Sequence, residues 1–164
     1  MIAFLVGFFT VTGCKKPPLI DNLYTVPDPV QNWNRVNPGS ADRAWRHTQN
    51  HAVIYVDVNC ESKFRDRSLS DSMLSLFWGI KVGDIIEQSH FTISNRAALY
   101  RVVNGEIDGV QARLGGIVVS KNACLYDFIL ISEPSHYPAN AVDFIQLAQG
   151  LRTPQLNTLS TSDN

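Results

Sequence analysis

The feature that most constrains the fold is a series of four apolar runs, separated by short turn sequences, in the second half of the chain. The runs cover residues 85–93, 97–103, 110–119 and 124–131. They are separated by "SN" at 94–95, "NGEIDG" at 104–109 and "SKN" at 120–122. Asn and Gly are the residues that tight hairpins need at positive φ. The sequence therefore predicts an antiparallel meander.

Two further strands and two helices accompany the meander. Residues 52–58 are apolar at both alternating positions, which predicts a strand covered on both faces. Residues 30–36 alternate imperfectly and predict a short edge strand. Ser68 and Asp71 have the spacing of a helical capping box. The expected apolar stripe of that helix is Leu69, Met73, Leu74, Phe77 and Ile80.

The last segment predicts a second helix, with Pro138 as a first helical residue. Its expected apolar stripe is Ala141, Phe144, Ile145, Ala148 and Leu151. This order of elements is typical of an α+β fold, in which an antiparallel sheet of about five to six strands packs with two helices. A chain of 164 residues suits one domain. We expect that domain at residues 41–152, followed by a disordered polar tail at 153–164.

The pattern resembles the PsbP-like superfamily, which includes the DcrB-related bacterial lipoproteins. Three stretches carry the resemblance: "NRAALYRVVNGEIDGVQARLGGIVVS", "CLYDFILI" and "DFIQLAQGLR", within residues 45–152. The first is similar to the central hairpins of that family and the last to its closing helix. The resemblance implies an extracytoplasmic accessory role and brings no shared catalytic residues.

The start of the chain resembles a bacterial lipoprotein signal. The apolar run at 2–13 is too short to span a bilayer, and it ends in "VTGC", which looks like a lipobox. Residues 1–13 would then be a signal peptide, and Cys14 would carry the lipid. Residues 14–40 are rich in Pro and predict a lipidated tether. The alternative is a buried N-terminal strand or helix with a free Cys14.

The other two cysteines form an even pair once Cys14 is lipidated. Cys60 ends one predicted strand and Cys124 begins another. In antiparallel neighbours the end of one strand lies beside the start of the next, and an envelope compartment oxidises thiols. We therefore expect a disulfide between Cys60 and Cys124. Two buried, unpaired cysteines are the alternative.

Candidate chemistry is sparse in this sequence. His47 and His51 have the spacing of zinc ligands on a helix, but they flank a predicted strand, so we expect no metal site. Asp57 and Asp127 lie within apolar strand runs, where burial would perturb their pKa values unless a partner compensates. We expect no catalytic residues and no cofactor.

The segment "WRHTQNH" at 45–51 mixes aromatic, basic and imidazole groups. Its residues Trp45, Arg46, His47 and His51 are the best candidates for a functional surface. Trp33, Trp45 and Trp78 could line a ligand groove, but in a domain of this size a core position is the commoner one, and we expect it for these tryptophans.

These observations favour a non-enzymatic envelope lipoprotein that binds another envelope protein. It would face the periplasm, and Lys15 after the lipidated cysteine favours the outer membrane over the inner one. A formal net charge of -1 gives no argument for a nucleic-acid partner. The first alternative is a carrier of a small apolar or lipid ligand between sheet and helix. The second alternative is an envelope enzyme.

Overall fold

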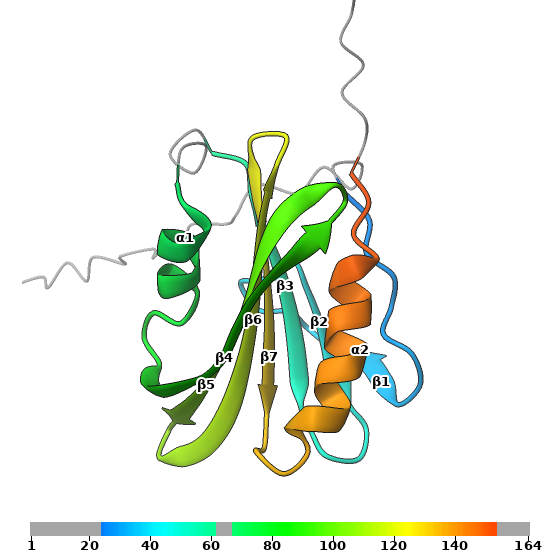
Figure 1. The fold of residues 1–164 in the computed structure, drawn as a ribbon. Coiled ribbons are helices and arrows are strands. Elements are labelled where there is room, and N and C mark those ends of the chain that lie inside the picture. Colours follow the sequence, from blue (N-terminus) through cyan, green and yellow to red (C-terminus); the bar gives the residue numbers. More distant parts are fainter. Residues whose placement is uncertain (1–23, 62–66, 154–164) are drawn as a thin grey trace, which may run out of the picture.

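The computed structural model describes residues 24–61 and 67–153. In these residues the chain forms seven strands and two helices (Figure 1). The elements are β1 Trp33–Arg35, β2 Arg43–His47, β3 Val53–Asn59, α1 Leu69–Leu76, β4 Lys81–Ile93, β5 Arg96–Ile107, β6 Val110–Lys121, β7 Cys124–Ser132 and α2 Tyr137–Gln149. The α+β class is confirmed, and the sheet has more strands than expected. No helix in this part of the chain is long and apolar enough to cross a membrane.

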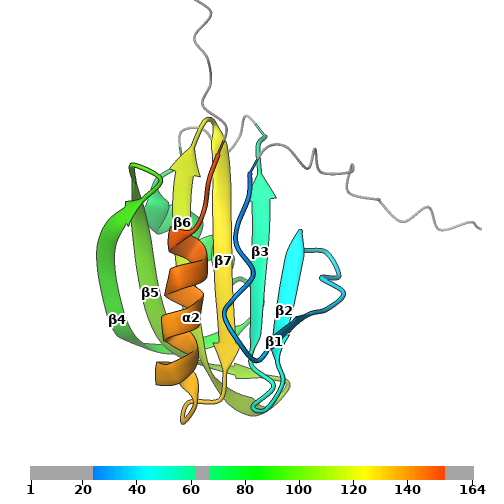
Figure 2. The same ribbon diagram turned by 90° about the vertical axis from the view of Figure 1, so that its right-hand side faces the viewer.

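The strands form one sheet in the order β1-β2-β3-β7-β6-β5-β4, and neighbouring strands run antiparallel. The meander from β4 to β7 brings β7 back to the centre of the sheet, beside β3. Figures 1 and 2 show α1 against one face of the sheet and α2 against the opposite face. The sheet therefore separates two layers of side chains, one under each helix.

The hairpin turns follow the sequence chemistry closely. Ser94 and Asn95 join β4 to β5 with φ of 49° and 60°, and Asp108 and Gly109 join β5 to β6 with φ of 51° and 82°. Two successive left-handed residues are the signature of a type I′ hairpin turn. The expected loop at 104–109 was too long, because the ladder between β5 and β6 continues to Ile107 opposite Val110.

Adjacent glycines in β6 allow both helices to approach the sheet. A Cβ on Gly115 would overlap the Tyr137 hydroxyl of α2. A Cβ on Gly116 would lie 2.8 Å from side-chain atoms of Leu76 and Phe77, on the α1 face. Because successive residues of a strand face opposite sides, one Gly-Gly pair serves both layers.

The N-terminal described segment belongs to the domain. Tyr24, Val26 and Trp33 are buried in the main core, and Thr25 exchanges two backbone hydrogen bonds of 2.8 Å with Arg152. Residues 24–33 therefore belong to the domain rather than to a tether, because Tyr24, Val26 and Trp33 form part of the layer on the α2 face. The signal peptide at 1–13, the lipidation at Cys14, the tether at 14–23 and most of the tail at 153–164 lie outside the described residues.

Helix α1 begins as expected and ends early. Ser68 is its N-cap, and the Ser68 hydroxyl accepts a hydrogen bond from the Asp71 backbone N–H at 3.0 Å. Met73 and Phe77 are buried against β5 and β6, but Leu74 is 65% exposed and Trp78 is 90% exposed. The expectation of core positions for Leu74 and Trp78 is wrong. Leu74 lies about 100° around the helix from Met73, and Trp78 follows the helix end.

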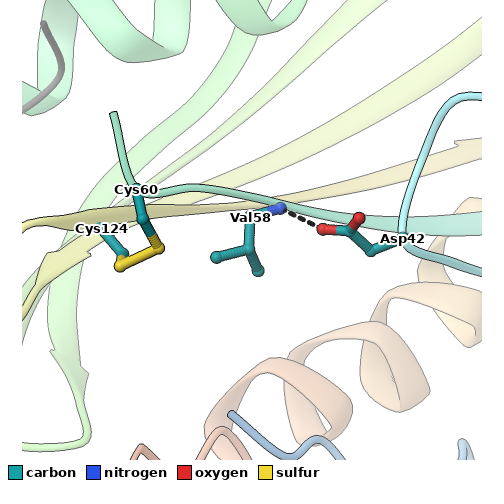
Figure 3. Close-up of a disulfide and its surroundings, with 4 residues drawn as sticks. All are labelled: Asp42, Val58, Cys60 and Cys124. Atoms are coloured by element: carbon teal, nitrogen blue, oxygen red, sulfur yellow. Dashed lines mark hydrogen bonds between the residues drawn. A yellow bond between two sulfur atoms is a disulfide. The ribbon is translucent and has the colours of Figure 1, made fainter. Parts of the chain in front are cut away.

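The disulfide prediction is confirmed. Cys60, just after β3, is bonded to Cys124 at the start of β7, with an S–S distance of 2.05 Å (Figure 3). Two residues before Cys60, the backbone N–H of Val58 donates to Asp42 Oδ2 at 2.7 Å. This end of β3 is therefore held to β7 on one side and to the β1–β2 connection on the other.

Candidate functional site

A groove lies on the α1 face of the sheet, where α1 leaves part of the face uncovered. Helix α1 packs on β5 and β6. On the same face, the alternate residues of β3 and β7 that do not enter the main core remain half-buried. The groove lies between these strand residues, α1 and the turn at residues 38–41, and it has a volume of about 720 Å³. We call it the carboxylate groove.

Two carboxylates lie side by side on the groove floor. Asp57 of β3 and Asp127 of β7 are direct partners in the antiparallel register, and both line the groove. Facing residues of neighbouring strands have Cβ atoms about 5 Å apart. The sequence singled out both residues, and the structure brings them together as one pair.

Asp127 is the more perturbed of the two. Burial first, and then the neighbouring Asp57 carboxylate, raise the pKa of Asp127 to about 7, although the Arg67 guanidinium partly opposes the shift. Asp127 Oδ1 is buried and accepts no hydrogen bond from the described residues. A buried carboxylate oxygen without a donor carries a free-energy cost that a bound hydrogen-bond donor would relieve.

The walls of the groove contribute one cation and several hydroxyls. Arg67 lies just before α1 and donates a hydrogen bond to the Ser75 hydroxyl. The hydroxyls of Ser72 and Ser75 donate to the backbone carbonyls of Ser68 and Asp71, each at 3.0 Å. Both serines are thus held by their own helix rather than by a base, an arrangement that does not activate a nucleophile.

The arrangement suits binding of a positively charged group. An amine or guanidinium could donate to Asp127 and would be attracted by two carboxylates against one arginine. Among residues 24–61 and 67–153, no three His, Cys, Asp or Glu side chains gather as metal ligands would.

The candidate surface at 45–51 is not one surface. Trp45 is 1% exposed, and its indole Nε1 donates to Asp28 Oδ1 at 2.8 Å. His47 is also buried, and its Nδ1 accepts from the backbone N–H groups that follow it, at 3.3 Å each. Arg46 and His51 are exposed. The four residues are divided because residues 43–47 form β2, whose alternation turns Trp45 and His47 inward and Arg46 outward. The burial of Trp45 is the core position expected of a tryptophan here.

A second, smaller groove lies on the α2 face between α2 and the β4–β5 hairpin. Its volume is about 380 Å³, and its apolar lining includes Ile86, Val102, Ala141, Val142 and Ile145. Tyr100 and Tyr137 also line it, with their hydroxyl oxygens 3.1 Å apart. Burial raises the pKa of both tyrosines, which therefore stay neutral.

Comparisons with known proteins identify the fold. No protein-family model and no curated protein sequence matches this chain. LpqN, described as involved in cell envelope biogenesis of Mycobacterium tuberculosis, is similar with a TM-score of 0.55 and 12% identity over 80% of this chain and 83% of its own.

Two further solved structures are similar. The cyanobacterial PsbP protein of Synechocystis matches with a TM-score of 0.54 and 9% identity over 88% of this chain and 99% of its own. Protein PA94 of Pseudomonas aeruginosa, of unknown function, matches with a TM-score of 0.51 and 15% identity over 78% of this chain and 85% of its own. At these identities the likeness concerns the fold, and the fold is PsbP-like.

Proposed function

We propose that this chain is a non-catalytic accessory domain of the bacterial cell envelope, anchored by lipid on Cys14, which binds another envelope protein through the carboxylate groove. The observation that carries the proposal is the buried, unsatisfied Oδ1 of Asp127 beside Asp57 in an open groove. The "VTGC" motif and the similarity to LpqN support an envelope location, and Lys15 favours the outer membrane.

The partner segment presents a lysine or arginine to the groove floor. Its cation satisfies Asp127 Oδ1 and is held by both carboxylates, and the same two carboxylates repel an acidic partner. A bound cation stabilises the ionised carboxylate. Because the pKa of Asp127 in the free protein is about 7, binding releases a proton below that pH and strengthens as pH rises toward 8.

The test is crosslinking and affinity capture from solubilised membranes with the full-length chain. Asp127→Asn keeps the shape of the side chain and removes its charge, and we expect it to reduce recovery of the partner at least tenfold. Asp108→Asn is the matched control, because it removes the same charge from an exposed turn where Asn also suits positive φ. Equal recovery by both variants would contradict binding through the groove.

The anchor has its own test, which is mass spectrometry of the mature N-terminus. We expect an acylated Cys14 as the first residue and release of the Cys14→Ser chain from membranes. An unmodified Cys14 inside a longer chain would refute the anchor.

The apolar groove beside α2 favours a second candidate function, transport of a small apolar ligand. We expect native mass spectrometry of the chain purified from cells to show a bound ligand that Val142→Trp expels. Val30→Trp is the control, because Val30 is equally exposed but lies outside the groove. A ligand-free native chain would count against this function.

A further inference from the structure

Most of the exposed large apolar side chains in the described residues come from one stretch of the chain. Nine large apolar side chains are exposed in the described residues, and five of them come from the stretch 74–86: Leu74, Trp78, Val82, Ile85 and Ile86. This stretch joins the end of α1 to the first half of β4, the outermost strand of the sheet (Figure 1). Ile86 lines the groove beside α2, and we call the other four residues the apolar edge.

The apolar edge is not needed to close the core beneath α1. Met73 and Phe77 fill that layer against Leu99, Leu114 and Val118. Trp78 is 90% exposed, whereas Trp33 and Trp45 are buried and donate their indole N–H groups to Asp143 and Asp28. A fully exposed Trp beside an exposed Leu is typical of a surface that contacts another phase or molecule.

The length of the chain before the domain indicates what covers this edge. Nine residues lie between Cys14 and Tyr24, the first described residue, and an extended chain that joins the two spans at most about 35 Å. A domain of this size is also about 35 Å across. A lipid on Cys14 would therefore keep the domain close to the bilayer, and the side chains themselves would select the face that contacts it.

We propose that the apolar edge rests in the headgroup region of the bilayer that holds the Cys14 lipid. This proposal depends on the membrane anchor of the proposed function. Trp favours the membrane–water interface, where its ring is apolar and its N–H remains hydrated. Arg67 and Lys81 are outnumbered by Asp71, Asp84 and Glu87 in the same region, so apolar contact rather than attraction to anionic lipid drives the insertion.

The orientation has a consequence for the carboxylate groove. Arg67 and Ser75 line both that groove and a shallow depression beside Leu74 and Trp78. Helix α1 therefore lies between the two, and insertion of the edge holds the groove near the membrane surface. The segment bound there would come from the part of an envelope protein closest to the bilayer.

Tryptophan fluorescence of the lipidated full-length protein in phosphatidylcholine vesicles tests the proposal. Because Trp33 and Trp45 are buried, the difference between the native chain and Trp78→Ala isolates the emission of Trp78. We expect that emission to shift to the blue when the protein is bound to vesicles. Its quenching by iodide should fall at least threefold, and brominated lipid should quench it. Anionic lipid at 30% of the vesicle should change these values by less than twofold.

Leu74→Ser should restore iodide quenching of Trp78 at least partly, whereas Val30→Ser, an exposed site far along the chain, should not. Trp78 that remains fully quenched by iodide in vesicles, with Cys14 acylated, would overturn the proposal and leave the anchor intact. Protection of Trp78 only after addition of membrane proteins would also overturn it, in favour of a protein contact. An unacylated Cys14 would instead refute the proposed function.

Discussion

The two faces of the sheet use alternate residues of the same strands, but they are covered to different extents. On the α2 face, α2 and residues 24–33 bury one continuous layer of side chains. On the α1 face, the short helix covers only β5 and β6 and leaves the half of the face formed by β3 and β7 open as the carboxylate groove. The comparison separates a face that stabilises the fold from a face that is free to bind.

The largest expected effect concerns the closed face. Phe144 of α2 is fully buried, and Phe144→Ala should lower the free energy of unfolding by about 4 kcal/mol, because it leaves a large cavity in a packed layer. Ile129→Ala, on the half-buried floor of the groove, should cost about 1 kcal/mol. Urea unfolding followed by circular dichroism measures both. Equal costs for the two variants would break the comparison.

A smaller effect, with a characteristic pH dependence, concerns the open face. The pKa of Asp127 is about 7 in the folded protein and has its ordinary value near 4 in the unfolded chain. The folded protein therefore binds more protons between these values, and its stability falls as pH rises from about 4 to 7. We expect a loss on the order of 3 kcal/mol over this range.

Asp127→Asn should remove that slope, since the amide does not titrate. Asp108→Asn should keep it, because Asp108 is exposed in a turn. The measurement is urea unfolding at a series of pH values. If the free energy of unfolding changed equally between pH 4 and 7 in the native protein and in Asp127→Asn, the surroundings of Asp127 would not raise its pKa.

Local chemistry in the sequence predicted the meander well. The turn residues at 94–95 and 108–109 adopt positive φ, and the disulfide forms between the expected strand ends. These features depend on neighbouring residues or on one strong covalent constraint. By contrast, the sequence did not predict β2. Arg46 and His47 give this segment a polar character, although it is a strand that buries Trp45.

The carboxylate pair was also accessible from the sequence. In an antiparallel ladder, residues equally far from a known pair face each other. Asp57 is three residues before Cys60, and Asp127 is three residues after Cys124, so the predicted disulfide implied the pairing that the register shows. The opening of the groove could not be derived in this way, because it depends on how far α1 extends across the face.

The smallest expected effect on stability concerns the apolar edge, and it sharpens the contrast with Phe144. Trp78→Ala should change the free energy of unfolding by less than about 0.5 kcal/mol, because the side chain is 90% exposed and loses little burial. An exposed Trp without a role in stability is consistent with contact outside the domain. Urea unfolding of the detergent-free Cys14→Ser chain provides the measurement. A loss above 1 kcal/mol would mean that Trp78 packs on its own domain, and the edge would then be part of the core rather than a surface for the bilayer.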